Sequence, residues 1–302
     1  MPDRLGAPLP APLFNRLAII GLGLIGSSLA RAARARNLAA AIVAIDASET
    51  VRDRVTQLNL ADTVTGDTAN GVRDADFIIL CVPVGACGSV AETMRPGLAK
   101  GAIISDVGSV KGSIVAQIAP HLPANVHFVP AHPVAGTEYS GPDAGFSTLF
   151  LNRWCILTPP DGTDPAATAK VRAFWEAIGS NVEEMSPAHH DRVLAITSHL
   201  PHLIAFTICG TADDLGNETR QEVVNFAASG FRDFTRIAAS DPVMWRDIFL
   251  NNREAVLEML ARFTEDAQAM ARAIRWGDTA YIEDKVERGR KIRRSLIEQK
   301  QA

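Results

Sequence analysis

A glycine-rich turn near the N-terminus constrains the fold of this chain more than any other feature. The segment LAIIGLGLIGSSLARAA places Gly21, Gly23 and Gly26 in a GxGxxG pattern between an apolar run and a helical stretch. In such a unit the first glycine permits a tight turn, the second lets the backbone approach a pyrophosphate, and the third allows close helix–strand packing. The helix N-terminus, with Leu24 and Ile25, faces the phosphate charge. The pattern predicts a dinucleotide-binding site.

The residues after this turn favour NAD over NADP. Asp46 follows the second apolar run, AIVAI, and lies 20 residues beyond Gly26. A carboxylate at this place accepts hydrogen bonds from ribose hydroxyls and repels a 2′-phosphate. The next residues include no arginine before Arg52. Val82 and Pro83, in the segment CVPV, follow a later strand end, and we expect them to line the cofactor crevice.

The pattern of apolar runs divides the chain in two. Up to about Met185, short apolar runs alternate with helix-length segments, which predicts crossover units and a mainly parallel sheet. The predicted strands are 17–20, 41–45, 77–82, 102–107, 127–130 and 154–159. Beyond Met185 the pattern is helical, with Ser186 as a helix N-cap before Pro187 and a second such start at Ser240. We therefore predict a flexible tail (1–15), a Rossmann-type dinucleotide-binding domain (16–185) and an all-α substrate and dimerisation domain (186–302).

Composition and charge argue against several kinds of partner. The formal net charge is 30 − 34 = −4, which does not favour nucleic acid or an anionic membrane. The uncharged run 193–212 includes Ser198, His199 and His202, so we expect a buried helix and not a membrane span. The N-terminus lacks the apolar core of a signal peptide. The four cysteines lie in apolar surroundings without metal-ligand spacing. The sequence predicts a cytoplasmic protein with reduced thiols and no metal.

The C-terminal segment carries an apolar stripe at helical spacing. Its members are Val256, Leu260, Phe263, Ala267, Met270 and Ile274. A second helix is predicted after Gly277, with Tyr281, Val286, Ile292 and Leu296. The stripe either packs within its own domain or joins two copies of the chain in a homodimer.

Candidate catalytic residues lie where two strands end. The first segment, SDVGSVKG, contains Asp106, Ser109 and Lys111, and the second, PAHPVAGTEYSG, contains His132, Glu138 and Tyr139. A dehydrogenase needs a group that accepts a hydroxyl proton while hydride leaves the same carbon, and neutral imidazole does so near pH 7. We therefore predict His132 as the general base. Ser109 either assists at the same substrate oxygen or caps the helix that follows it.

Five segments in order resemble the prephenate/arogenate dehydrogenase family: GLGLIGSS, DVGSVK, HPVAGTE, SHLPH and GFRDFTRIAASDPVMWRDIF. The resemblance covers about residues 17–276. It implies NAD-dependent oxidative decarboxylation of prephenate to 4-hydroxyphenylpyruvate, or of arogenate to tyrosine, in tyrosine biosynthesis. It also implies that His132 is the general base at the ring hydroxyl, with Ser109 beside it.

The resemblance further implies a set of substrate-binding residues. Arg236 holds a substrate carboxylate, and Arg232, four residues earlier, shares its face if the segment is helical. The other implied positions are Ser198, His199, His202, Glu138 and Trp245. The alternative for Arg236 is a structural ion pair with Asp233 or Asp241.

Two other functions are compatible with a dinucleotide-binding domain followed by helices. A β-hydroxyacid dehydrogenase or imine reductase would place a catalytic lysine on the first helix of the second domain, but residues 187–209 contain no lysine. A non-enzymatic NAD-sensing dimer would have no reason to combine His132, Ser109 and Arg236. The sequence leaves open whether the substrate side chain is a keto acid or an amino acid.

Overall fold

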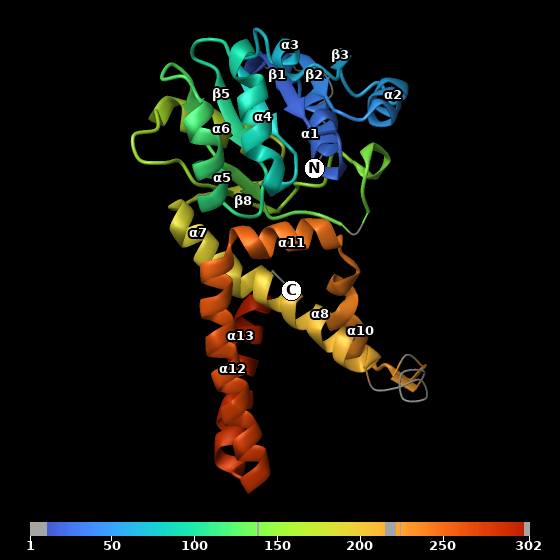
Figure 1. The fold of residues 1–302 in the computed structure, drawn as a ribbon, viewed down its shortest axis with the longest axis vertical. Helices are drawn as coiled ribbons and strands as arrows, with labels where there is room; N and C mark the ends of the chain where they lie inside the picture. Colours follow the sequence, from blue (N-terminus) through green and yellow to red (C-terminus); the bar gives the residue numbers. More distant parts are fainter. Residues whose placement is uncertain (1–10, 138, 215–221, 224, 299–302) are drawn as a thin grey trace. The chain divides into compact units, whose positions relative to one another are not determined.

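The computed structural model describes residues 11–137, 139–214, 222–223 and 225–298 (Figure 1). The chain divides into two compact units, one ending at Arg253 and the other beginning at Glu254. The first unit holds the whole α/β region together with the helices that follow it, as far as the end of α11.

A six-stranded parallel sheet forms the centre of the first unit, in the order β3-β2-β1-β4-β5-β6. Its strands are β1 (Phe14–Ile20), β2 (Ala39–Ile45), β3 (Thr63–Thr65), β4 (Phe77–Leu80), β5 (Ile103–Asp106) and β6 (His127–Phe128). This is the Rossmann strand order, so the predicted fold class is confirmed. The sheet begins at Phe14, inside the segment predicted as a tail, because the Phe14 ring is buried and stacks on Phe77 with centroids 4.4 Å apart. The short β3 was not predicted.

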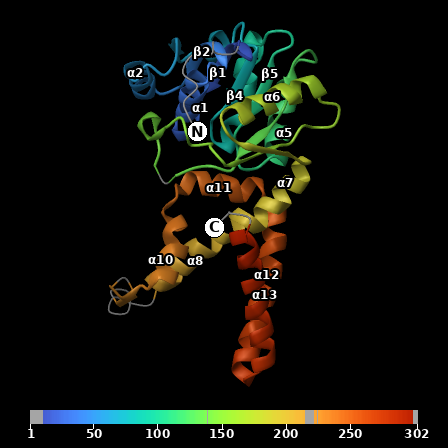
Figure 2. The ribbon, with the colours of Figure 1, turned by 180° about the vertical axis from the view of Figure 1, so that it is seen from behind.

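Helices cover both faces of this sheet (Figures 1 and 2). They are α1 (Leu24–Ala35), α2 (Glu49–Gln57), α3 (Thr68–Gly71), α4 (Cys87–Met94), α5 (Gly112–Ile118) and α6 (Pro165–Ala177). Successive side chains of a strand point to opposite faces. Leu17 and Ile19 of β1 therefore belong to a core shared with α1 and α6, whereas Ala18 and Ile20 belong to a second core shared with α4 and α5.

A second, three-stranded sheet carries the segment that contains His132. Its strands are β7 (Ala131–Pro133), β8 (Trp154–Leu157) and β9 (Asn181–Glu184), in that order. Strand β8 was predicted to extend the parallel sheet, and this is wrong: it pairs antiparallel with β7 and parallel with β9. The β7–β8 register sets His132 opposite Ile156.

The helical part of the first unit begins where it was predicted. Ser186 caps α7 (Pro187–Leu194) by accepting a hydrogen bond from the His189 N–H. A π-helical turn (Ala195–His199), α8 (Leu200–Asp213), α10 (Ser229–Thr235), a 3-10 turn (Arg236–Ala239) and α11 (Pro242–Asn251) follow. The cap of α11 is Asp241 and not Ser240, because the Asp241 carboxylate accepts from the Met244 N–H.

The expectation of a buried helix over 193–212 is wrong for the single chain. The continuous helical stretch Pro187–Asp213 is, by length and composition, apolar enough to cross a membrane, yet only 28% of its most apolar window is buried. Ile196 and Ile208 are exposed. The polar residues of its first half, described below, contact the α/β region of the same unit.

The second unit is a helical hairpin of α12 (Arg253–Trp276) and α13 (Thr279–Glu298). Gly277, with φ of 66°, makes the turn between them, and Lys285 Nζ bonds Asp266 Oδ1 at 2.6 Å. Within the predicted apolar stripe, Val256 is buried, but Phe263 and Ile274 are exposed.

Candidate active site

The turn between β1 and α1 has the geometry that a pyrophosphate requires. Gly21 has φ of 92°, and a Cβ there would lie 2.5 Å from the Cys81 carbonyl oxygen. A Cβ at Gly26 would lie 2.0 Å from the Gly21 carbonyl oxygen. A Cβ at Gly23, by contrast, would meet nothing within 4 Å, and Gly23 caps α1 without a side-chain bond. The open space and free N–H groups of the first turn, at Leu24 and Ile25, fit a dinucleotide phosphate.

Asp46 lies beside this turn. Its Oδ2 accepts from the Leu22 N–H at 2.8 Å and its Oδ1 from the Ser48 N–H at 2.9 Å. The carboxylate is therefore fixed at the end of β2, with lone pairs left for ribose hydroxyls. Arg52 is directed to the backbone of the same loop, donating to the Asp46 and Ala47 carbonyls. Val82 Cγ1 lies 3.1 Å from the Cβ that Gly21 lacks, so the Val82–Pro83 segment borders the turn. These residues fit NAD.

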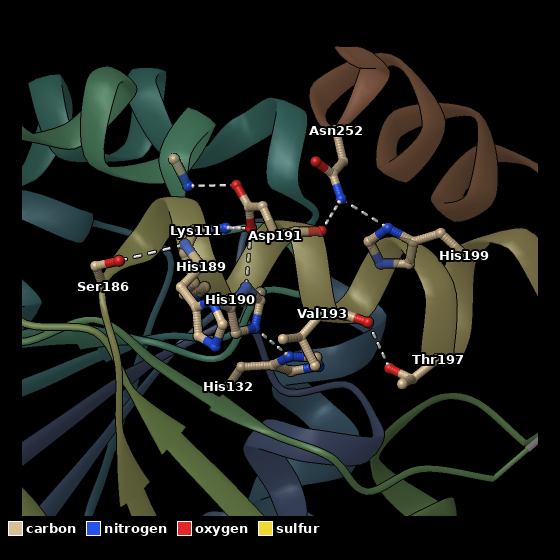
Figure 3. A network of polar contacts seen from close by, with 12 residues as sticks. Lys111, His132, Ser186, His189, His190, Asp191, Val193, Thr197, His199 and Asn252 are labelled. Carbon is tan, nitrogen blue, oxygen red and sulfur yellow. Dashed lines mark hydrogen bonds and ion pairs between the residues drawn. The ribbon is translucent and has the colours of Figure 1, made fainter. Parts of the chain in front are cut away.

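His132 is buried in the middle of β7, with 7% of its surface exposed. The sequence placed it just past a strand; the short β7 was not expected. Its Nδ1 lies 2.8 Å from Nε2 of His190, and His190 Nδ1 lies 2.8 Å from Oδ1 of Asp191 (Figure 3). Both partners come from α7, so the first helix after the α/β region reaches back to the catalytic strand.

Asp191 is held by the loop that follows β5. Its Oδ1 accepts from the Lys111 N–H at 2.7 Å, and its Oδ2 accepts from the Gly112 N–H at 2.8 Å. Asn252, after α11, donates to the Asp191 backbone carbonyl at 2.8 Å. The carboxylate thus accepts hydrogen bonds from two backbone N–H groups and from His190, while the Asp191 backbone carbonyl accepts from Asn252 (Figure 3).

A buried ion pair fixes the loop that carries Ser109. Lys111 Nζ is fully buried, pairs with Asp106 Oδ2 and donates to the Ala131 carbonyl at 2.7 Å. Burial raises the pKa of Asp106, and the Lys111 ammonium opposes that change. The pair ties the end of β5 to the residue before His132. In the described part of the chain, no group of His, Cys, Asp and Glu side chains is arranged to hold a metal ion.

The surroundings of His132 keep its imidazole neutral. Burial holds the pKa of His132 well below 6.5, and positive charge on His190, Lys111 and His199 would lower it further. Burial also lowers the pKa of His190, although its bond to Asp191 opposes the change. A neutral imidazole is the form that accepts a proton.

Two predicted substrate residues carry buried nitrogens for which the described part of the chain offers no hydrogen-bond partner. Asn252 Nδ2 lies 3.0 Å from His199 Nδ1, while His199 Nε2 has no hydrogen-bond partner among the described residues. Trp245 Nε1 is also buried, and within the same residues it too has no partner. The two rings lie 6.1 Å apart. Buried polar groups are normally satisfied, so the two donors mark this region as one that can bind a polar ligand. Burial lowers the pKa of His199 to about 4.

His202 connects this region to Arg236. Its ring stacks on Trp245 with centroids 3.8 Å apart, and its Nδ1 lies 2.9 Å from the Ser198 carbonyl oxygen. Burial lowers the pKa of His202; the bond to Ser198 opposes this, and the positive charge of Arg236 adds to it. Arg236 follows α10 directly, and no described acidic residue forms an ion pair with it. The alternative role for Arg236, an ion pair with Asp233 or Asp241, is therefore not seen.

The other residues predicted to act on the substrate are Arg232, Ser198, Ser109 and Glu138. Arg232 lies on α10 and is exposed, as is Arg236. Ser198 contributes its carbonyl oxygen to His202. The Ser109 backbone lies near His199 and slightly opposes the lowering of the His199 pKa by burial. Glu138 lies outside the described residues.

Sequence reasoning missed His190, Asp191 and Asn252. The signal for the first two was the segment HHD next to the Ser186–Pro187 helix start. Nothing in the sequence tells which of His189 and His190 faces the strand; in the structure His189 is exposed and His190 is buried.

Comparisons with known proteins cover both predicted domains. Residues 29–184 match the family described as prephenate dehydrogenase, nucleotide-binding domain, and residues 186–287 match prephenate dehydrogenase, dimerization domain. A cyclohexadienyl dehydrogenase from Zymomonas mobilis is 45% identical over 284 residues, 94% of this chain and 97% of the relative.

Solved structures give the same result. A prephenate dehydrogenase from A. aeolicus, in complex with hydroxyphenyl propionate and NAD+, is similar with a TM-score of 0.86 at 34% identity, covering 94% of this chain and 98% of that one. The arogenate dehydrogenase from Synechocystis has a TM-score of 0.80 at 26% identity, covering 93% and 99%.

Proposed function

Since the chain belongs to the prephenate dehydrogenase family, we infer that it catalyses the NAD-dependent oxidative decarboxylation of prephenate, arogenate or both. The family assignment confirms an NAD-dependent dehydrogenase and sets aside the two alternative functions. The observation that carries the chemistry is a buried histidine, His132, whose pKa is held well below 6.5. The same compact unit contains the dinucleotide turn and two buried nitrogens, on His199 and Trp245, that have no hydrogen-bond partner among the described residues.

We propose that His132 is the general base. Its Nδ1 faces His190, so Nε2 is the atom left to accept the proton of the ring hydroxyl. NAD+, when bound, supplies the acceptor for the hydride that leaves the same carbon. As the hydroxyl becomes a carbonyl, the electrons of the carboxylate's C–C bond flow into the ring, CO2 leaves and the ring becomes aromatic. The resulting phenolate oxygen then takes its proton back from His132.

Binding of the substrate requires concentrated positive charge. Prephenate is a dianion, whereas this chain carries a net charge of −4. A guanidinium binds a carboxylate with two parallel hydrogen bonds. We propose that Arg236, assisted by Arg232, binds a carboxylate, and that His199, His202, Ser198, Glu138 and Trp245 border the substrate. Ser109 is proposed to act at the ring hydroxyl.

The decisive experiment is an assay of NADH formation with prephenate, with arogenate and with a 3-hydroxy acid. Turnover of either cyclohexadienyl substrate, and none of the hydroxy acid, is the expected result. The ratio of kcat/KM on prephenate and arogenate gives the preference between a keto and an amino side chain. Absence of turnover with both would reject the proposed function.

The fixed Asp46 carboxylate supports a preference for NAD. Wild-type enzyme should have a higher kcat/KM with NAD than with NADP, and Asp46→Ser combined with a new neighbouring arginine should relax the difference. Equal values in the wild type would show that Asp46 does not select the cofactor.

We propose a cytoplasmic homodimer in which residues 186–302 form the substrate and dimerisation domain. The exposed Phe263 and Ile274 of the apolar stripe support pairing of two copies, and the four unpaired cysteines suit a reducing compartment. Light scattering should give about twice the 32.4 kDa chain mass at micromolar concentration. A mass of one chain would contradict the dimer.

A further inference from the structure

We propose that His190 and Asp191 are positioning residues that hold His132 in its proton-accepting tautomer and stabilise the imidazolium formed during turnover. The proposal rests on the proposed function, because it assigns these residues to the step in which His132 takes the hydroxyl proton. It follows from the order of donors and acceptors along one continuous chain of contacts (Figure 3).

The chain of contacts has a direction, and Asp191 sets it. Both Asp191 oxygens accept backbone N–H groups, from Lys111 at 2.7 Å and from Gly112 at 2.8 Å. An ionised carboxylate only accepts hydrogen bonds, so His190 Nδ1, 2.8 Å from Oδ1, carries a proton and donates it.

The tautomer of His190 then determines the tautomer of His132. A neutral imidazole has one donor and one acceptor nitrogen. With its proton on Nδ1, His190 presents a bare Nε2, and this atom lies 2.8 Å from His132 Nδ1. His132 therefore donates through Nδ1, and its Nε2 is left with a lone pair. The backbone N–H groups of Lys111 and Gly112 thus orient the base through the Asp191 carboxylate and the His190 ring.

The same contacts favour the protonated base. Burial disfavours a positive charge on His132, as does positive charge on its neighbours His190, Lys111 and His199, so the imidazolium needs a compensating contact. His190 in turn faces Asp191, Asp106 and Lys111. When His132 gains a proton on Nε2, its Nδ1–H bond to His190 strengthens, and the positive charge is shared toward Asp191. The proton does not have to pass from His132 to solvent, because the phenolate takes it back. It is sufficient that His190 and Asp191 stabilise the imidazolium until then.

The first test reads the tautomers directly. In 15N-histidine-labelled enzyme at pH 7.5, long-range 1H–15N spectra should show a protonated Nδ1 and a bare Nε2 for both His132 and His190. Signals are assigned by their loss in His132→Asn and His190→Gln. A proton on Nε2 of His132 would overturn the proposal. This result does not depend on turnover, so it decides the tautomer even if the proposed substrates fail.

The second test removes the imidazole between Asp191 and His132. His190→Leu leaves His132 Nδ1 without its partner, while Asp191 Oδ1 keeps only the Lys111 N–H. We expect kcat to fall about 10²- to 10³-fold while the KM for NAD changes less than about twofold. A purely structural role would instead lower Tm without changing kcat per folded molecule. A kcat within about threefold of wild type, in folded protein, would overturn the proposal.

A conservative variant separates orientation from charge and also covers the case in which His190→Leu does not fold. In His190→Gln the carboxamide can donate to Asp191 and accept from His132 but cannot share a positive charge. We expect near-wild-type Tm and a kcat at least about tenfold below wild type. A wild-type kcat would reject the charge-stabilising role. The matched control is His189→Gln, next along α7 with an exposed side chain, which should leave kcat unchanged.

Discussion

At the scale of single residues, burial determines the chemistry of the histidines. His132, His190 and His199 are buried, and burial is the main reason that their pKa values are lowered. An exposed imidazole would be partly protonated at pH 6 to 7, whereas these remain neutral. The acid limb of kcat should accordingly lie below pH 6.5.

Replacement of the base tests this directly. His132→Asn should lower kcat by roughly 10²- to 10⁴-fold, the usual contribution of a positioned general base. The Kd for NAD, measured by fluorescence quenching, should stay near that of the wild type because the dinucleotide turn is untouched. A variant that keeps more than about half of the wild-type kcat would remove His132 from the mechanism.

Arg236 offers a second test at this scale. Arg236→Gln should raise the KM for prephenate by about 10- to 100-fold, or about 1.4–2.7 kcal/mol. This is at or below the lower end of the roughly 2–5 kcal/mol lost for buried charge pairs, because Arg236 is exposed in the chain. The KM for NAD should hardly change. Arg246→Gln, an exposed arginine paired with Asp247, is the matched control. An unchanged KM for prephenate in Arg236→Gln would decide against carboxylate binding.

Single residues were predicted from the sequence where a motif named them. His132, Asp46 and the three turn glycines belong to such motifs. His190 and Asp191 do not, because adjacent helical residues point about 100° apart and only packing selects the one that faces β7. Asn252 could not be predicted either, because its partner His199 lies 53 residues away in the sequence and only folding brings the two together.

At the scale of elements, the β1–α1 turn contains two kinds of glycine. Gly21 and Gly26 are required by close backbone contacts, whereas Gly23 leaves space for a bound phosphate. Gly26→Ala should lower Tm, because the new Cβ would lie 2.0 Å from a backbone oxygen. Gly23→Ala should leave Tm near wild type, since nothing lies within 4 Å, while the Kd for NAD rises as the methyl group occupies the phosphate space. Thermal scans and NAD titration of both variants check this. Equal losses of Tm would contradict the distinction.

Elements were predicted well where apolar runs were long, as for β1, β2 and β4. The three-residue β3 and the polar β9 (NVEE) escaped because strands of that length carry no periodic signal. Strand β8 was recognised but assigned to the wrong sheet, since an apolar run does not state its partner. The start of α11 had two adjacent capping residues, and the structure uses Asp241.

At the scale of the whole molecule, the buried histidines make folding sensitive to acid. The pKa of His199 falls from 6.5 to about 4 on folding, so below pH 6.5 the unfolded chain binds protons that the folded chain does not. Stability is therefore complete above about pH 6.5 and is lost as the pH falls. His199 alone should contribute a loss of about 2 kcal/mol between pH 7.5 and 5.

Urea unfolding at fixed protein concentration and several pH values measures this loss. His199→Gln should be less stable than wild type at pH 7.5 but lose less stability between pH 7.5 and 5. The exposed His189→Gln should keep the wild-type dependence. If His199→Gln shows the same pH dependence as the wild type, His199 is not a source of the acid sensitivity.

Two contacts join α7 to the α/β region, and they place different demands on a chimera in which the α/β region comes from a related enzyme. The donors to Asp191 are backbone N–H groups of Lys111 and Gly112, which any non-proline residue would supply. The contact of His132 with His190 joins two side chains, one from each part. A chimera that imports residues up to about 185 from a homologue would keep the first connection unless the homologue has proline at position 111 or 112. It would keep the second only if the donor enzyme also has a histidine at the position of His132. His132 and His190 should therefore be taken from the same parent enzyme when chimeras are built.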